Sequence, residues 1–365
     1  MPRVHAPFAM GGVQSPDGLR VGDSPPKAAV LRDVTAARGW TPAALAARAA
    51  TAGAPVWLDG DELSFLFRGE AVAVRLCCGI QQDMHRLAGS DTWALTVKHR
   101  ALARAIVSYR FIPDAQPRVG ETLTVWRGPR APAAPAQATT LQGSVRVERL
   151  PSAALGEERE VTLYLPPGHT PAGRYPVIYA ADGEVAGGLG HVIEPHILSG
   201  ALPPLLIVGA HAGDNELRAR AYLPARDAAR FAAHARFFVE ELAAWAERTL
   251  GATSARALRA VFGFSNGGVC AGELALRHPD HFGIAMPFSA GVMPDTAQYP
   301  PQPSVRAYLA AGLFEEGFYT TTRAFATELE RAGASVAFSP RAAGHDYAMW
   351  EEEFAAATCW AFGAR

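Results

Sequence analysis

Apolar strand-like runs that alternate with helical stretches are the feature that most limits the fold of this chain. They begin near Val161 and continue to the last residues. Runs that are apolar throughout indicate strands buried on both faces, so the alternation predicts a mostly parallel sheet covered by helices on both sides. The predicted strands are residues 161–165, 177–181, 205–210, 258–262, 283–288, 305–310 and 335–338. The predicted helices are 228–250, 268–277, 320–332 and 350–362.

The first third of the chain follows a different pattern. Short runs rich in β-branched and aromatic residues occupy 62–67, 71–76, 91–97 and 105–112, with turn residues between them. This pattern predicts a small immunoglobulin-like β-sandwich. We therefore divide the chain into an N-terminal arm with one short helix (1–53), the sandwich (54–127), a Pro- and Ala-rich linker (128–140) and an α/β domain (141–365). The first 27 residues are expected to form a mobile tail or a surface arm.

Bulk composition excludes several classes of function. Hydrophobic residues make up 49% of the chain and charged residues 19%, and the formal net charge is −1. Such a chain folds in water, and it has no overall field that would attract nucleic acid or an anionic membrane. No apolar run approaches the roughly 20 residues of a membrane span, and no leader pattern begins the chain. We expect a cytoplasmic protein that binds neither nucleic acid nor membrane. Its oligomeric state stays open.

The four cysteines show no metal-binding or disulfide spacing. Cys77 and Cys78 are adjacent, and Cys270 and Cys359 stand alone. No C-x-x-C pair is present, so the sequence predicts free thiols, no zinc site, and chemistry without a metal or cofactor.

The strongest local signal for chemistry is Gly263-Phe-Ser-Asn-Gly267, which fits G-x-S-x-G. It follows an apolar strand and precedes a helical run, which is where a nucleophile elbow requires it. A sharp strand-to-helix turn lifts the hydroxyl of Ser265 above the sheet, and glycine tolerates the close backbone approach on either side. The N–H of Asn266, near a helix N-terminus, is a candidate oxyanion donor. The alternative is a glycine-rich turn that only packs a helix on the sheet.

A serine nucleophile needs a base. Of the 11 histidines, His278, His281 and His345 follow Ser265. His345 lies between the last predicted strand and the last predicted helix, where this architecture delivers its base. His278 and His281 lie at a helix end, and His345 could instead be a loop residue beside the final helix. We predict His345 as the base.

The acid that orients the base should follow the strand at 305–310. Glu315 and Glu316 lie there, and we favour Glu315. The alternative is that the pair is a solvated helix start. Asp295 precedes the strand, and Asp346 adjoins His345.

A second oxyanion donor is expected after the strand at 177–181. The loop Asp182-Gly-Glu184 offers the backbone N–H of Gly183 or Glu184. A simple β-turn is the alternative.

These motifs together resemble an esterase family of α/β-hydrolases that includes enterochelin (siderophore) esterases, esterase D, feruloyl esterases and mycolyltransferases. The similar stretches are residues 179–184, 218–224, 263–268, 310–315 and 344–350. The Gly-His-Asp-x-x-x-Trp ending is most similar to siderophore esterases, which also carry an N-terminal sandwich. The resemblance implies a Ser265, His345 and Glu315 triad, with Arg218 and Trp350 as substrate-binding candidates. A lone arginine is also a common ion-pair residue.

Two departures weaken the implied specificity for a siderophore. Ala221 stands where the family has a glutamate, and residues 288–291 lack the aromatic residues often found there. We therefore keep three hypotheses. The first is a hydrolase of an enterochelin-like ester, with a ferric siderophore as its small-molecule partner. The second is a general carboxylesterase, feruloyl-type esterase, acyltransferase or peptidase. The third is a non-catalytic binding protein. The sandwich could also cover the active site, and Trp57 and Trp93 are interpreted as core residues.

Overall fold

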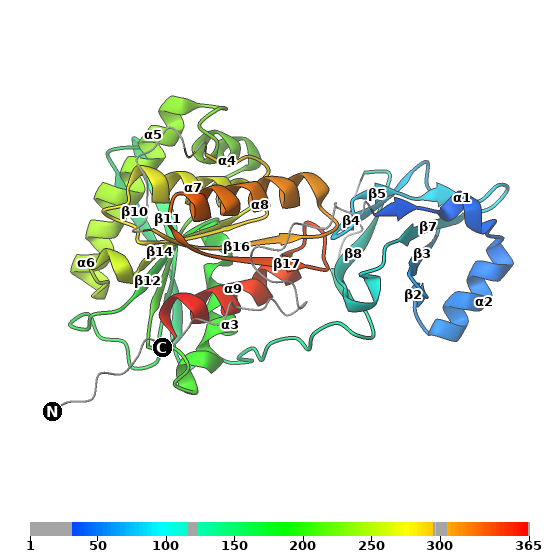
Figure 1. Cartoon of the computed structure of the whole chain (residues 1–365), viewed down its shortest axis with the longest axis horizontal. Helices are drawn as coiled ribbons and strands as arrows, with labels where there is room; N and C mark the ends of the chain where they lie inside the picture. The colour runs from blue at the N-terminus through cyan, green and yellow to red at the C-terminus, as the bar shows by residue number, and fades with distance from the viewer. Residues whose placement is uncertain (1–30, 116–122, 295, 297–304, 364–365) are drawn as a thin grey trace.

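The computed structural model describes residues 31–115, 123–294, 296 and 305–363, which form a large α/β domain and a smaller β domain (Figure 1). The expected tail at residues 1–27 and Asp295 lie outside the described residues. In the large domain the predicted alternation produces one mixed sheet. Its order is β10 (Ser144–Ser152), β11 (Glu157–Leu165), β13 (Leu206–Ala210), β12 (Val177–Ala181), β14 (Arg259–Phe264), β15 (Ile284–Phe288), β16 (Arg306–Gly312) and β17 (Ser335–Arg341).

The strands from β13 to β17 run parallel, and β10 and β11 are antiparallel additions at one edge. Parallel strands bury both faces, which explains why β12, β13 and β15 are buried along their whole length. The predicted α/β-hydrolase fold is confirmed. It matters for function because the carboxyl ends of β12, β14, β15, β16 and β17 meet at one edge of the sheet.

Two apolar cores cover the two faces of the sheet. One core packs α5 (Ala228–Arg236), α6 (Ala243–Leu250), α7 (Asn266–Arg277) and α8 (Glu316–Arg331) on one face. The other packs α3 (Ala186–Leu198) and α9 (Tyr347–Phe362) on the opposite face, as Figure 1 shows. The predicted helix at 228–250 is interrupted by a π-helical segment, Phe237–Leu242. Helices α3 and α4 (Asn215–Tyr222) were not predicted, and α3 contains Gly and Pro residues that weaken a helical pattern.

The small domain contains two antiparallel sheets, as expected of a sandwich. One sheet holds β1 (Arg32–Asp33), β2 (Val56–Asp59), β3 (Glu62–Arg68), β6 (His85–Arg86) and β7 (Thr92–Lys98). The other holds β4 (Val74–Cys78), β5 (Gln82–Asp83), β8 (Ile106–Pro113) and β9 (Thr124–Arg127). Trp93 is buried in the core between the sheets, and Trp57 is buried against Leu45 of α2 (Pro42–Ala52).

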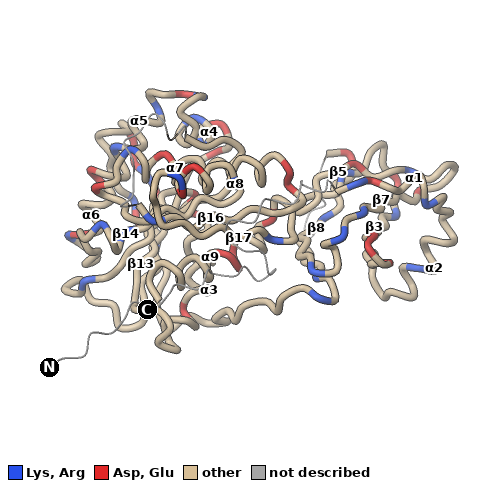
Figure 2. The backbone as a smooth tube through the Cα atoms, viewed as in Figure 1, with Lys and Arg blue, Asp and Glu red and all other residues tan. Residues whose placement is uncertain are grey.

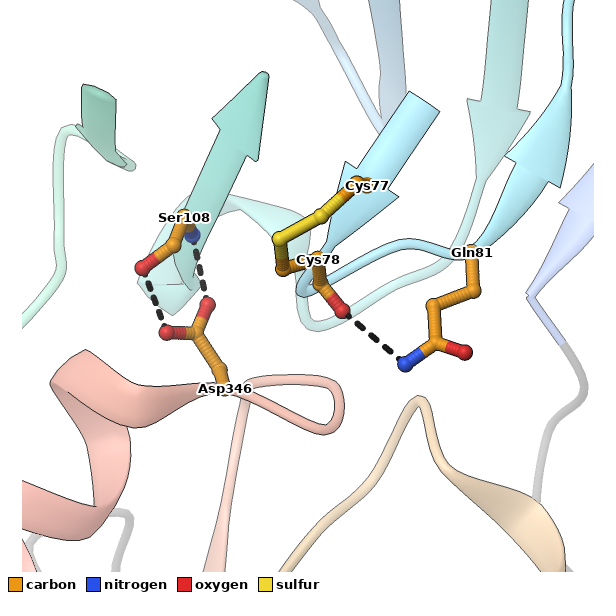
Figure 3. Close-up of a disulfide and its surroundings, with 5 residues drawn as sticks. All are labelled: Cys77, Cys78, Gln81, Ser108 and Asp346. Atoms are coloured by element: carbon orange, nitrogen blue, oxygen red, sulfur yellow. Dashed lines mark hydrogen bonds between the residues drawn. A yellow bond between two sulfur atoms is a disulfide. The ribbon is translucent and has the colours of Figure 1, made fainter. Parts of the chain in front are cut away.

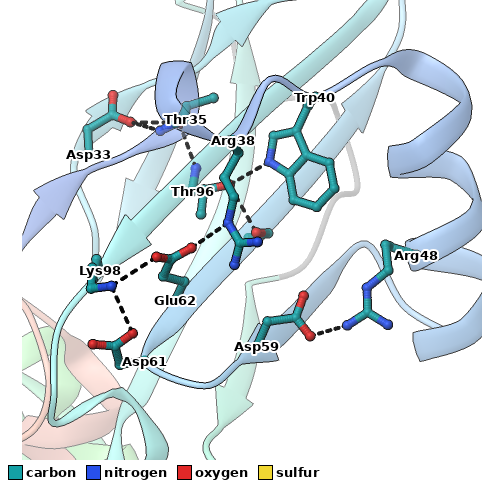
Figure 4. Close-up of polar contacts among 11 residues, drawn as sticks. Asp33, Thr35, Arg38, Trp40, Arg48, Asp59, Asp61, Glu62, Thr96 and Lys98 are labelled. Atoms are coloured by element: carbon teal, nitrogen blue, oxygen red, sulfur yellow. Dashed lines mark hydrogen bonds and ion pairs between the residues drawn. The ribbon is translucent and has the colours of Figure 1, made fainter.

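The sandwich begins earlier in the chain than residue 54. Strand β1 pairs with β7, and the short helix α1 (Thr35–Arg38) follows it. The hydroxyl of Thr35 accepts a hydrogen bond from the Thr96 backbone N–H at 2.7 Å, and the Trp40 indole N–H donates to the Thr96 hydroxyl at 2.9 Å (Figure 4). Part of the expected arm is therefore tied to the sheet. Two polar residues give no period-2 pattern, which is why the sequence did not reveal this strand.

One expectation about the cysteines is wrong. Cys77 and Cys78 are joined by a disulfide at the end of β4 (Figure 3), whereas Cys270 and Cys359 are free thiols. The sequence argument considered only spaced pairs, and it therefore missed a bond between neighbours. This bond lies next to Gly79, where the sandwich contacts the large domain.

Two further features of the described residues are the distribution of their charges and the length and apolarity of their helices. Acidic and basic residues are interspersed in both domains (Figure 2), which agrees with the near-zero net charge. None of the described helices combines the length and apolarity needed to cross a bilayer.

Candidate active site

Ser265 occupies a sharp turn between β14 and α7. Its backbone has φ 56° and ψ −126°, a left-handed conformation that is strained for a residue with a side chain. A Cβ on Gly263 would overlap the carbonyl of Gly267, and a Cβ on Gly267 would lie 2.8 Å from Asp182 Oδ2. Both glycines are therefore required by close contacts, which is the steric reason for the G-x-S-x-G pattern.

The backbone donors predicted for an oxyanion lie on two adjacent loops. Asn266 is the first residue of α7, and N–H groups in the first turn of a helix have no acceptor within that helix. Gly183 and Glu184 begin a short 3-10 helix after β12, and the contact between Asp182 and Gly267 brings that loop to the elbow. Gly183 also packs so closely on Gly209 that a Cβ would overlap its carbonyl. The two loops thus converge beside Ser265.

Glu315 and His345 form a hydrogen-bonded pair. The Nδ1 of His345 lies 2.6 Å from Glu315 Oε2, and we assign the proton to Nδ1 because a carboxylate only accepts. The Glu315 side chain is 3% exposed and that of His345 is 16% exposed. Burial raises the pKa of the Glu315 carboxyl, although its bonds to His345, Gly312 and Ser289 oppose that rise. A buried, oriented carboxylate fixes both the tautomer and the angle of the imidazole.

The other candidates for base and acid lie elsewhere. Glu316 is exposed at the start of α8. His278 and His281 contact each other at the C-terminal end of α7. That helix has 12 residues, so its far end is about 18 Å from Ser265 at a rise of roughly 1.5 Å per residue.

The sequence reasoning missed Ser289, which follows β15. Its hydroxyl donates to Glu315 Oε1 at 2.5 Å and accepts from the Trp350 indole N–H at 2.8 Å. The Gly312 backbone N–H donates to the same Oε1 at 2.6 Å. Ser289 is fully buried and has φ 46°. The only sequence signal was its position at the carboxyl end of a buried strand.

Trp350 links the base to the nucleophile loop. Its ring stacks on Phe264 at 4.4 Å and meets the His345 ring edge-on at 4.7 Å. The imidazole also contacts the ring of Phe318, with the ring centroids 4.2 Å apart. Trp350 is only 7% exposed, so the structure places this predicted substrate-binding residue beneath His345.

The structure records no hydrogen bond between Ser265 Oγ and His345 within the part of the chain that it describes. In ligand-free enzymes such bonds are often long and shorten only when substrate binds. Both side chains are partly exposed, and both flank the same Trp350 and Phe264 pair.

Arg218, predicted as a substrate grip, pairs with Asp182. Its Nε and Nη2 donate to the two carboxylate oxygens at 2.5 and 2.7 Å, and Nη2 also donates to the Phe264 carbonyl at 3.2 Å. Burial raises the pKa of Asp182, and the guanidinium opposes that rise. Arg218 therefore holds the loop at Gly183 against the elbow strand, as the ion-pair alternative anticipated.

A cavity of about 390 Å³ opens beside His345 between the two domains. The large domain contributes Gly291, Phe314, Glu315, Glu316, Gly317, Phe318 and His345, and the sandwich contributes Leu31, Gly79, Ile80, Gln81 and Gln82. No arginine or lysine lines it within the described residues, and Glu316 is its only carboxylate besides Glu315. In the same part of the chain, no cluster of three or more His, Cys, Asp or Glu side chains is placed to hold a metal.

Residues 152–361 match the family model described as "Putative esterase", which covers more than half of the chain. The chain belongs to this esterase family. The esterase is also 28% identical over 144 residues to the uncharacterised protein YjcH of Bacillus subtilis, and it spans 59% of the length of that relative. The predicted family is confirmed, and membership of it supports the predicted activity, carboxylic ester hydrolysis.

Solved structures with the same fold include esterases from several sources. The enterobactin esterase FES from Shigella flexneri matches with a TM-score of 0.66 at 20% identity, covering 84% of the esterase and 94% of that chain. The ferric enterobactin esterase from Salmonella typhimurium matches with a TM-score of 0.66 at 19% identity, and the match covers 84% of this chain and 95% of that one. A ferulic acid esterase matches with a TM-score of 0.52 at 22% identity, and the match covers 61% of this chain and 98% of that one. At such identities these likenesses show the fold.

Proposed function

We propose that this esterase cleaves its substrate through a triad in which Ser265 is the nucleophile, His345 the general base and Glu315 the orienting acid. The observation that carries the proposal is the 2.6 Å contact between His345 Nδ1 and the buried Glu315 carboxylate. A histidine with Nδ1 protonated presents an unprotonated Nε2, which is the atom that must take the serine proton. The strained turn at Ser265 supports the same assignment.

The reaction has two halves. Ser265 Oγ attacks the ester carbonyl while its proton moves to His345 Nε2, and the N–H groups of Asn266, Gly183 and Glu184 stabilise the oxyanion. The bond from the carbonyl carbon to the leaving oxygen then breaks, and His345 returns the proton to that oxygen. Water attacks the acyl-enzyme with His345 again as base, which releases the acid and restores the serine.

We further propose that the substrate is a small ester whose group beside His345 is uncharged and apolar or aromatic. The cavity supports this, because Leu31, Ile80, Phe314 and Phe318 line it, with Gln81 and Gln82 as neutral polar groups. Arg218 is occupied by Asp182 and carries no free charge toward an anion. A feruloyl-type or simple acyl ester fits this lining.

An enterochelin-like siderophore ester is the second candidate. The observation in its favour is that the match to enterobactin esterases extends over both domains, at 84% of this chain, whereas the ferulic acid esterase covers 61%. An iron-loaded catecholate carries several negative charges, which the described cavity lining does not neutralise.

Hydrolysis of p-nitrophenyl butyrate and labelling by a fluorophosphonate probe test the triad. Ser265→Ala should lower kcat by about 10³-fold or more and abolish labelling. Ser199→Ala, which changes an exposed serine at the end of α3, should behave as wild type. Equal turnover in Ser265→Ala and wild type would refute the triad. A higher kcat/KM for an iron-loaded catecholate trilactone than for neutral aryl esters would instead favour the siderophore candidate.

A further inference from the structure

The loop that carries His345 is held by the sandwich domain. Its neighbour Asp346 comes from the large domain, yet its carboxylate is bound by Ser108 of β8 (Figure 3). The Ser108 hydroxyl donates to Oδ1 and the Ser108 backbone N–H donates to Oδ2, both at 2.5 Å. These residues are 238 positions apart in the chain, and both are fully buried.

The other neighbour of His345 also contacts the sandwich. A Cβ on Gly344 would overlap the carbonyl of Gly79, so the two backbones touch. The Ile106 N–H donates to the Ala342 carbonyl at 2.9 Å, and Ala342 packs in the sandwich core. The segment from Ala342 to Asp346 therefore packs against the sandwich at β8 and at Gly79, which follows β4. His345 lines the cavity.

Asp346 transmits this contact to the start of α9. Its Oδ1 also accepts from the Ala348 N–H at 2.9 Å, which caps the helix. Since the carboxylate is buried, each of its bonds offsets part of a desolvation cost, and removal of one bond leaves more of that cost uncompensated. The loop can lower that cost by moving Asp346 toward water, which would carry His345 with it.

We propose that Ser108 is a positioning residue for His345 and acts through Asp346, so that the sandwich domain completes the active site of the large domain. This inference rests on the role of His345 proposed above. It explains why a β domain with no predicted catalytic side chain packs against the base loop. It also assigns a function to two side chains that the triad does not use.

Ser108→Ala tests the proposal, with kcat and KM for a neutral aryl ester and the rate of fluorophosphonate labelling as readouts. A shift of about 1 Å in a catalytic group can reduce the rate by roughly 100-fold. We therefore expect kcat and labelling to fall between about 10- and 100-fold with little change in KM. Ser108→Thr keeps the hydroxyl and should restore most of the rate.

Ser64→Ala is the matched control, because Ser64 is equally buried in the sandwich and bonds to Thr96 at 2.9 Å away from the base loop. It should lower the melting temperature without lowering kcat. If Ser108→Ala does not fold, Asp346→Asn is measured in the same assays, since either orientation of its amide turns the NH₂ toward a backbone N–H, that of Ser108 or that of Ala348. A folded variant of either kind with wild-type kcat would overturn the proposal. If Ser265→Ala loses activity while the Ser108 and Asp346 variants do not, the positioning role of Ser108 is refuted and the proposed triad is retained.

Discussion

The rings of Phe264 and Trp350 stack with centroids 4.4 Å apart and an interplanar angle of 15°. Phe264 directly precedes the nucleophile, and Trp350 contacts the ring of His345. The stack therefore connects the elbow loop to the base. Within the described chain, Ser265 and His345 themselves share no hydrogen bond. The integrity of the stack should govern how often the two side chains reach a reactive distance.

Trp350→Phe should lower kcat by about 10-fold while largely preserving the fold. The phenyl ring keeps contacts with Phe264 and His345, but it loses the indole N–H that donates to Ser289 at 2.8 Å. Losing one buried hydrogen bond costs roughly 1–3 kcal/mol. Steady-state kinetics and thermal unfolding measure both effects. Trp360→Phe on the same helix is the control, and an equal loss of kcat in that variant would contradict a specific role for Trp350.

Glu315→Gln should lower kcat by about 10⁴-fold and leave KM nearly unchanged. The amide oxygen would still accept from Gly312 and Ser289, so the amide NH₂ would face His345 Nδ1. An imidazole that accepts at Nδ1 carries its proton on Nε2, which cannot then take the proton of Ser265. Kinetics over a range of pH would check this, and a variant with more than a tenth of wild-type kcat would argue against the role.

The same substitution should not destabilise the fold at neutral pH. Burial raises the pKa of Glu315 above the ordinary value of 4.5, so the folded protein binds this proton more tightly than the unfolded chain does. The contribution of this group to the free energy of unfolding is therefore full below that ordinary value and is lost as pH rises through the raised pKa. Glutamine has no such loss. Chemical denaturation at pH 8 should give Glu315→Gln at least the stability of wild type.

Arg218→Met should destabilise the esterase and slow neutral and anionic esters alike. It leaves the buried Asp182 carboxylate without its partner, which typically costs about 3–5 kcal/mol. The double variant Arg218→Met, Asp182→Asn should recover most of that stability, because it removes the unpaired charge. Urea unfolding and kcat/KM on the two classes of ester provide the measurements. A selective loss on anionic esters, with stability unchanged, would instead support a substrate-gripping arginine.

His234→Phe should reduce the loss in free energy of unfolding that wild type shows as pH falls below neutral. His234 is fully buried beside Tyr222 and Phe238, and neither of its ring nitrogens has a hydrogen-bond partner among the described residues. Burial lowers its pKa from 6.5 to about 3, with Arg159 and Arg230 adding to the effect.

The unfolded chain therefore binds a proton at His234 below pH 6.5 while the folded chain does not. Stability from this group is present above pH 6.5 and is lost as pH falls toward 3, by on the order of 3–5 kcal/mol. Denaturation at pH 7 and pH 4 measures the difference between wild type and His234→Phe. An equal drop in both proteins would refute the assignment.

The sequence alone determined the parallel strands of the α/β sheet, the helical stretches that follow residue 228 and the turn at Ser265. Periodicity and steric demands act over a few residues, and the apolar runs at β12, β14 and β16 record them directly. The order of elements also placed His345 and Glu315 after the strands whose carboxyl ends meet at one edge. The misses included the nine-residue edge strand β10, the two-residue β1 and the Gly- and Pro-containing α3.

Only the tertiary structure decided what each polar side chain contacts. It paired Glu315 with His345, left Glu316 exposed, and directed Arg218 to Asp182. It also joined Cys77 to Cys78 and set Ser108 beneath the base loop, 238 positions from Asp346 in the chain. Such contacts depend on how two domains and several loops converge in space, and local sequence patterns carry no record of distances between segments far apart in the chain.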